Sequence, residues 1–169
     1  GHWGTTPQKG QKQKEIEKLS KGEERVEIKF SFNARDENYK TSSWTSTFTP
    51  SWNEIIANVF PVCINEANEF TIIKQFNEYI ENERYPFLMK DKRLKSQALL
   101  RFSIEKDSFH TVIIQLRALQ MIGKSTKGKS IKDTATYWSL TPKGDEQLIL
   151  LRAIKSRDIE DRSEVTEET

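Results

Sequence analysis

The feature that most constrains the fold is a segment of fifteen residues, 134–148, which reads TATYWSLTPKGDEQL. Its aromatic residues predict a short strand over 137–140. Thr141-Pro142 then ends the strand and begins a helix, because a Thr hydroxyl accepts a hydrogen bond from a free helical N–H and Pro fits the first helical position. We expect this helix over 142–156, with an apolar side formed by Leu148, Ile149 and Leu151.

A second amphipathic helix is expected before this segment, over residues 108–121, with Asp107 as its cap and Gly123 closing it. Its core-facing residues recur at helical spacing: Phe109, Val112, Ile113, Leu116, Leu119 and Ile122. The stretch 124–132 predicts a β-hairpin of two short strands joined around Gly128. A helix, a Lys-rich hairpin, a strand and a capped helix, in this order, are typical of the end of a winged-helix module.

The N-terminal half predicts a linker, then strands. Residues 1–24 are rich in Lys, Gln and Glu and predict a disordered linker that includes a tag remnant, with a frayed helix over 14–19. Apolar and polar residues alternate over 26–32, which predicts a strand. A second strand over 41–49, with Trp44, Ser46 and Phe48 on one side, would complete a hairpin. A disordered Ser/Thr linker after Asn38 is the alternative.

Two further helices are expected in the middle of the chain. Ser51 and Glu54 form a capping box at the start of the first, and its buried stripe would be Trp52, Ile55, Ile56, Val59 and Phe60. The second is expected over 68–83, with a core stripe of Phe70, Ile73, Phe76 and Ile80. A connector interrupted by Pro86 and a short helix over 96–102 would follow. The predicted architecture is α+β: a winged helix-turn-helix over 25–157 with an N-terminal β-hairpin and extra helices, and a flexible tail over 158–169.

Charge is distributed unevenly along the chain. Residues 92–157 hold 14 Lys or Arg and 5 Asp or Glu, a net charge of +9, whereas the tail 158–169 carries −5. A basic segment of this kind indicates a surface that faces a polyanion. Ordinary solvated lysines on a small domain are the competing interpretation.

Two groups of residues are candidates for nucleic-acid contacts. The exposed side of the 108–121 helix would present Ser108, His110, Thr111, Gln115, Arg117 and Ala118. Gln can bond adenine and Arg can bond guanine through two atoms each. Four lysines of the hairpin, Lys124, Lys127, Lys129 and Lys132, would neutralise phosphates. Lysines that keep an edge strand from pairing are the alternative.

No catalytic group is predicted. The single cysteine, Cys63, lies in an apolar segment and is expected to be a small core residue. His110 is the one histidine outside the presumed tag, and Gly-Lys-Ser at 128–130 lacks the strand-to-helix context of a phosphate-binding loop. We therefore expect no enzyme activity, cofactor, metal or membrane partner, and a cytoplasmic location.

The residues also carry a resemblance. Segments 107–122, 132–145 and 151–154, and more loosely 51–55 and Phe60-Pro61, resemble the C-terminal winged-helix module of bacterial proteins that begin with a TIR-like domain of unknown function. The resemblance spans roughly 44–157. It implies the C-terminal piece of a larger bacterial sensor or defence protein and supplies no catalytic residues. This chain has Gln120 where the family pattern has Gly.

The function predicted from the sequence is therefore a non-catalytic recognition module that binds nucleic acid through the Lys-rich hairpin and the 108–121 helix. The alternative is a protein-interaction or oligomerisation module that binds no nucleic acid, with the N-terminal hairpin and Trp44 as its contact.

Overall fold

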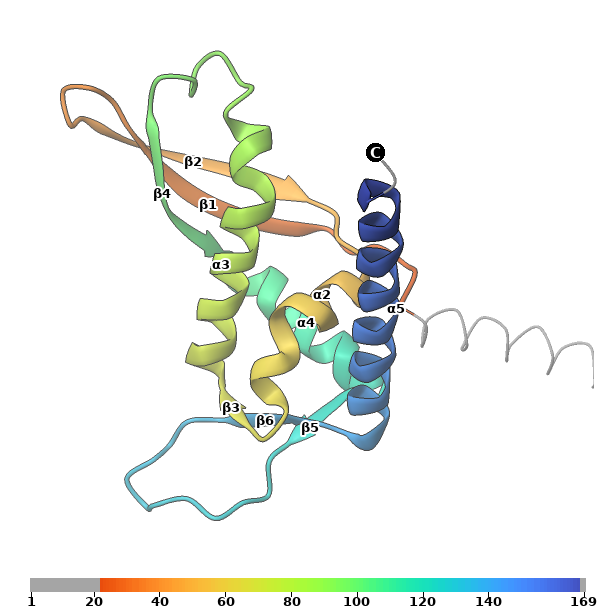
Figure 1. Ribbon diagram of the computed structural model, residues 1–169. Helices are drawn as coiled ribbons and strands as arrows, with labels where there is room; N and C mark the ends of the chain where they lie inside the picture. The colour runs from red at the N-terminus through yellow and green to blue at the C-terminus, as the bar shows by residue number, and fades with distance from the viewer. Residues whose placement is uncertain (1–21, 168–169) are drawn as a thin grey trace, which may run out of the picture.

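The computed structural model describes residues 22–167, and side chains from 22 to 156. The predicted linker 1–24 therefore lies outside the described residues except for its last three. The described chain is mixed α+β, with four α-helices, one short 3-10 helix and two small antiparallel sheets (Figure 1).

The first sheet is built on the N-terminal hairpin. β1 (Ile28–Arg35) and β2 (Thr41–Phe48) pair along their full length, from Ile28 opposite Phe48 to Arg35 opposite Thr41. This pairing confirms the predicted hairpin and excludes the linker alternative. β4 (Ala98–Ile104) pairs with the other side of β1, which gives the strand order β2-β1-β4.

The helix predicted over 96–102 is wrong, because this segment forms β4. Leu99, Phe102 and Ile104 are buried, but a register shift interrupts the alternation, and Arg101 sits at a φ of 56°. A bulge adds a residue to one strand and so breaks the period of two that marks a strand in sequence. The buried residues Leu99 and Phe102 are three positions apart, a spacing that also occurs along one side of a helix.

The first helix agrees with its sequence signals. α2 (Trp52–Val59) begins at the capping box, in which Glu54 N–H donates to Ser51 Oγ at 3.1 Å. The whole predicted stripe is buried. The short helix η2 (Phe60–Cys63) and the two-residue strand β3 (Ala67–Asn68) follow. Cys63 is fully buried, and burial raises the pKa of its thiol to about 12.

The second predicted helix exists but differs in length and in its buried face. α3 (Glu69–Leu88) includes Pro86 in its last turn, so Pro86 does not interrupt a connector as predicted. Phe70 was expected in the core but is 76% exposed. The buried stripe consists of Ile72, Phe76, Tyr79, Ile80 and Leu88, and Phe70 lies two residues before it, on the opposite side of the helix.

The second sheet is formed mainly by the C-terminal half of the chain. α4 (Lys106–Ala118) leads into β5 (Ile122–Lys124), and a loop over 125–136 leads to β6 (Tyr137–Leu140). β6 lies between β3 and β5. The predicted hairpin with two strands inside 124–132 is therefore wrong, because most of that stretch belongs to the loop.

The last helix begins as predicted and ends later. α5 (Pro142–Glu167) starts at Thr141, whose Oγ1 accepts the Gly144 N–H at 3.1 Å, and it continues past the predicted end at residue 156. Leu148 is buried, as expected, but Ile149 is 61% exposed. Ile149 follows Leu148 by one residue, about 100° around the helix, and this rotation turns it away from the core.

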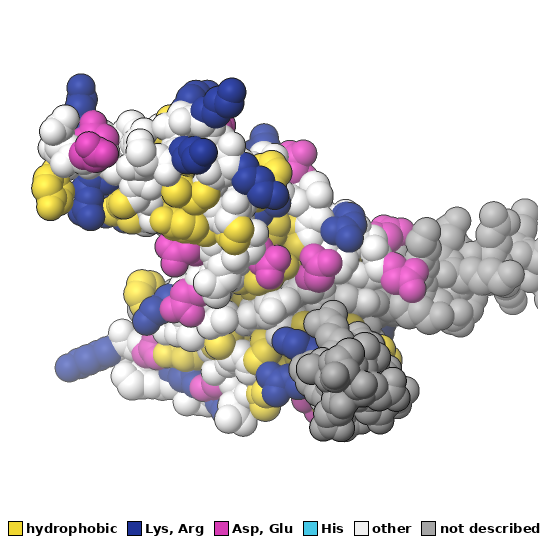
Figure 2. Space-filling view, turned by 45° about the horizontal axis from the view of Figure 1, so that its top comes forward, with side chains coloured by type: hydrophobic (Ala, Val, Ile, Leu, Met, Phe, Trp, Pro, Cys, Tyr) yellow, Lys and Arg dark blue, Asp and Glu magenta, His cyan; other side chains and the backbone are white. Residues whose placement is uncertain are grey.

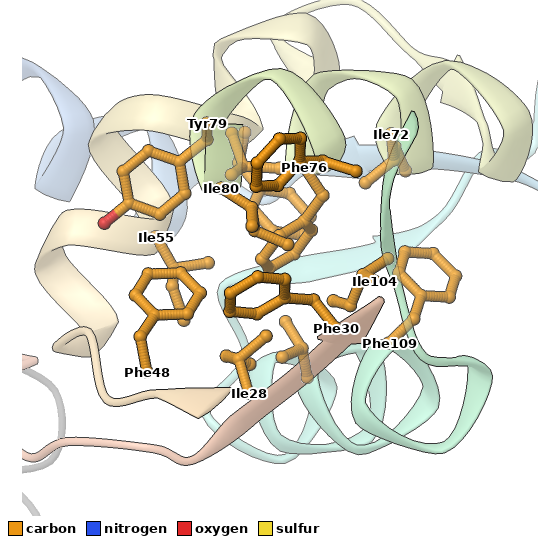
Figure 3. Close-up of a cluster of buried hydrophobic side chains, with 14 of the residues drawn as sticks. Ile28, Phe30, Phe48, Ile55, Ile72, Phe76, Tyr79, Ile80, Ile104 and Phe109 are labelled. Atoms are coloured by element: carbon orange, nitrogen blue, oxygen red, sulfur yellow. The ribbon is translucent and has the colours of Figure 1, made fainter. Parts of the chain in front are cut away.

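One core holds both sheets together. Figure 3 shows Phe30 of β1 and Phe48 of β2 among Ile55 of α2 and residues of α3. Ile104 of β4 and Phe109 of α4 complete this group. In Figure 1 α3 lies across the first sheet and reaches down to the second. The N-terminal sheet is therefore part of the same packed unit as α4.

Candidate nucleic-acid interface

The start of α4 is fixed by β1. Ser108 Oγ accepts the Lys29 N–H at 3.0 Å, and Glu105 N–H donates to the Lys29 carbonyl at 2.9 Å. Glu105 occupies the cap position without a side-chain cap bond, so the predicted capping role of Asp107 is wrong. β4 ends at residue 104, so its pairing with β1 places the start of α4 beside β1. The first sheet therefore sets the direction of the α4 axis.

The end of α4 is a tight left-handed turn. Met121 N–H donates to Leu116 C=O, and Gln120 N–H to Arg117 C=O, both at 2.9 Å. This is the Schellman pattern, and its left-handed position is Gln120 at a φ of 60°. Gln120 therefore closes the helix, whereas the predicted Gly123 lies in β5.

The polar side of α4 is open to solvent. After the first turn, in which Lys106 and Asp107 are also exposed, the exposed residues are His110, Thr111, Ile114, Gln115, Arg117 and Ala118. Ser108, by contrast, is half-buried and its hydroxyl is engaged with Lys29. Five of the six residues predicted for the exposed side therefore lie there, and Ser108 serves to anchor the helix. Ile114 is 63% exposed and was not anticipated, because it had no place in the buried stripe or in the list of polar residues.

The four lysines do not have equivalent surroundings. Lys124, Lys127 and Lys132 are exposed. Lys129 forms an ion pair with Glu66, and its Nζ lies 4.1 Å from the centre of the Tyr137 ring. Ser125 Oγ donates to the same Glu66 carboxylate. Glu66 therefore links the loop 125–136 to the segment before β3. It also pairs with the charge of Lys129, which is one of the four lysines predicted to contact phosphates.

A second acidic residue acts inside the loop. Tyr137 OH donates to Asp133 Oδ2, and Asp133 Oδ1 accepts the Ala135 N–H at 3.0 Å. These hydrogen bonds lower the pKa of Asp133, and the same contact raises the pKa of Tyr137. The loop is thus held by side chains at both of its ends.

Helix and loop side chains meet in two adjoining hollows. The first, of about 330 Å³, is lined by residues that include His110, Arg117, Lys124 and Trp138. The second, of about 220 Å³, is lined by Lys124, Ser125, Lys127, Lys129, Ala135, Thr136 and Tyr137. Lys124 and Thr136 line both. The basic groups of α4, β5 and the loop therefore form one surface, although Lys132 lines neither hollow.

The first hollow has an aromatic floor. The Arg117 guanidinium lies 5.2 Å from the centre of the Trp138 ring, and Trp138 itself is 4% exposed. Its buried Nε1 has no hydrogen-bond partner among the described residues. Glu69 supplies an acidic group at the rim. The sequence predicted Arg117 as a site residue, but it did not predict Glu66, Glu69 or Trp138. These three residues are distant in sequence from the side chains they contact, so no local pattern indicates that they lie beside α4 or the loop.

The charge of the molecule is mixed elsewhere. On the face in Figure 2, Lys and Arg side chains lie among Asp and Glu, and they form no continuous basic area there. In the described part of the chain, no three His, Cys, Asp or Glu side chains come together as metal ligands would. No helix within 22–167 has the length and apolar character needed to cross a membrane.

Comparison with known proteins assigns no family to this chain: no family model, no curated protein and no solved structure matches it.

Proposed function

We propose that this chain carries a non-catalytic winged-helix module that binds duplex nucleic acid through the exposed side of α4 and the loop 125–136. The element order supports this proposal. A helix, a short strand, two helices separated by β4, and two strands occur in the order α2, β3, α3, α4, β5 and β6, and β3 pairs with β6. By the resemblance of 107–122 and 132–145, the module would belong to a larger bacterial sensor or defence protein.

One departure from a simple helix-turn-helix has a structural explanation. The connection between α3 and α4 contains β4, which pairs with β1. The N-terminal hairpin and β4 thus replace the short turn that usually sets the angle between the two helices. In this proposal the first sheet is a support that orients α4, and it leaves the polar side of the helix uncovered.

The observation that carries the proposal is the continuity of the basic surface. Arg117 of α4, Lys124 of β5 and Lys127 of the loop line adjoining hollows that share Lys124. In this proposal the basic side chains neutralise phosphates. Thr111 and Gln115 are exposed on the side of α4 that would enter the major groove, where they would contact base edges. With Lys129 engaged by Glu66, three lysines remain for phosphates.

A binding titration tests the proposal. Duplex DNA, duplex RNA and a single strand are each titrated with the chain by fluorescence anisotropy across a salt series. Three phosphate contacts predict a slope of log K against log salt of about −3 for a duplex, at about 0.9 per contact. Lys127→Glu should weaken binding, and Lys90→Glu, the same charge change two residues after the end of α3, should not. Absence of binding to every probe at low salt would contradict the proposal.

Exposed Ile114 favours one other candidate, a protein-interaction surface at the same place. An Ile on the outer side of α4 can contact a thymine methyl group, or it can enter an apolar pocket of a protein partner. The two functions separate experimentally. A protein complex that persists at high salt and is lost in Ile114→Asp, without any duplex binding, would assign the surface to a protein.

A further inference from the structure

Among the described residues, an unpaired strand edge lies at the opposite end of the molecule from the loop 125–136 (Figure 1). β2 is one edge of the first sheet, and it runs for eight residues. Exposed edge strands are templates for pairing with another chain, and proteins usually guard them with charge, proline or bulges. The sequence of β2, TSSWTSTF, contains no charged residue and no proline.

The other edges of the described sheets are guarded or short. β4 carries a register shift and Arg101 at a φ of 56°. β3 and β5 have two and three residues. β2 therefore differs from every other edge strand in this part of the chain, because it is long, regular in register and neutral.

The hydrogen-bonding pattern shows which backbone groups of β2 are free. Asp36 N–H donates to Lys40 C=O, and Val26 N–H donates to Pro50 C=O, both at 3.0 Å. Antiparallel pairs alternate between bonded and non-bonded, so residues 42, 44, 46 and 48 direct their backbone to β1. The residues that direct their N–H and C=O groups to the free edge are Thr41, Ser43, Thr45 and Thr47, and all four are exposed.

The side chains of β2 are nearly symmetric about one residue. Reading outward from Trp44, the flanking pairs are Ser43 with Thr45, Ser42 with Ser46, and Thr41 with Thr47. A two-fold axis perpendicular to the sheet at Trp44 would place each residue opposite its counterpart in a second copy. Pairs of Ser and Thr hydrogen-bond favourably across strands, and no like charges meet.

We propose that β2 pairs antiparallel with β2 of a second copy of this chain, with Trp44 opposite Trp44, so that two three-stranded sheets join into one of six strands. The backbone agrees with this register. Thr41 lies opposite Thr47 and Ser43 opposite Thr45, and each of these four residues has its N–H and C=O directed to the free edge. Shifting the centre to Ser43 or Thr45 shortens the pairing and places Trp44 opposite Ser.

The surroundings of Trp44 suit this arrangement. Its ring is half-buried and stacks on Phe32 at 6.3 Å between ring centres. Arg93 covers it at 4.9 Å, and Asp91 accepts two side-chain hydrogen bonds from Arg93. The Arg93 cation close to the axis is therefore paired with a carboxylate within each copy. Strand pairing alone is smaller than a standard interface of about 1,200–2,000 Å², so the dimer is weak and reversible.

The oligomeric state tests the proposal. Analytical ultracentrifugation over a concentration series should show a monomer–dimer equilibrium that salt does not weaken. Thr45→Lys places a charge on the free edge, opposite Ser43 of the second copy, and should raise the dissociation constant at least tenfold. Ser103→Lys adds the same charge to exposed β4, where the backbone faces β1, and should leave the constant unchanged. A wild-type chain that stays monomeric up to its solubility limit would overturn the proposal.

Cross-linking tests the register. Residues facing each other in a non-bonded pair have Cα atoms about 4.5 Å apart, close enough for a disulfide. Trp44→Cys should therefore form a covalent dimer on oxidation. Thr47→Cys should not, because its counterpart lies six residues further along, about 20 Å away. Buried Cys63 gives no background. Cross-linking of both variants to the same extent, or of neither, would exclude this register. These outcomes are independent of whether the basic surface binds nucleic acid.

Discussion

Gly144 at the start of α5 lies directly against the main-chain carbonyl of Met121 at the end of α4: a Cβ on Gly144 would stand 2.1 Å from that oxygen. The same junction is bridged by Thr141, whose N–H donates to Met121 C=O at 3.0 Å and whose hydroxyl donates to Gln120 C=O. The basic surface therefore depends on a close contact between two helix ends.

The first prediction concerns this contact. In an ordinary helix Gly→Ala stabilises by about 1 kcal/mol, but Gly144→Ala forces the two backbones apart. We expect a loss of about 2 kcal/mol or more in the free energy of unfolding, measured by urea denaturation. Gly128→Ala is the control, because a Cβ there meets nothing within 4 Å. Equal stability of both variants would refute the contact.

The second prediction concerns the left-handed turn after α4. Gln120 holds a φ of 60°, which glycine adopts without the steric cost of a Cβ. Gln120→Gly should stabilise the protein by about 0.5–1 kcal/mol. The same substitution at Gln115, on the exposed side of α4, should destabilise it by about 1 kcal/mol. If both changes have the same sign in thermal denaturation, α4 does not end at this turn.

The third prediction concerns Glu66. Its side chain is 17% exposed and holds both Lys129 and Ser125. Glu66→Gln keeps the shape but loses the charge, so amides in the loop 125–136 should exchange with deuterium severalfold faster. If the loop binds phosphates, the freed Lys129 should also make the salt slope steeper by about 1. Glu69→Gln, beside the neighbouring hollow, should leave the exchange rates as they were.

The fourth prediction concerns pH. Hydrogen bonds from the Arg93 side chain lower the pKa of Asp91 to about 2. Because this folded-state pKa is below the unfolded value of about 3.9, the contact contributes stability above about pH 4 and loses it as the pH falls toward 2. An NMR titration should show this midpoint in the wild type and a higher one in Arg93→Gln. Lys90→Gln should keep the wild-type midpoint.

Local signals in the sequence were sufficient for much of the fold. The capping box at Ser51, the alternation along β1 and the Thr141-Pro142 start of α5 each act through neighbouring residues, and all three are present. The buried stripe of α4 agrees from Phe109 to Leu116, since helical spacing fixes which residues share a side, whereas predicted Ile122 lies in β5. These features depend on contacts within a few residues of one another.

Features set by distant contacts were not predictable in this way. β4 is a strand because β1 pairs with it, and its bulge at Arg101 hides the alternation. Ser108 looked free for recognition but is held by Lys29, and Lys129 looked free but is held by Glu66. In both cases the partner lies more than 60 residues away in sequence. The net charge of residues 92–157 therefore did not show which side chains are available to bind a ligand, because that depends on partners distant in sequence.

The central claim is that α4 and the loop 125–136 together contact a duplex, and NMR mapping tests it most directly. Titrating the ¹⁵N-labelled chain with a short duplex at low salt should shift the amides around Thr111, Gln115, Lys124 and Lys127, and leave those of β2 unchanged. Shifts confined to β2 and the end of α3, or no shifts at all, would contradict the account.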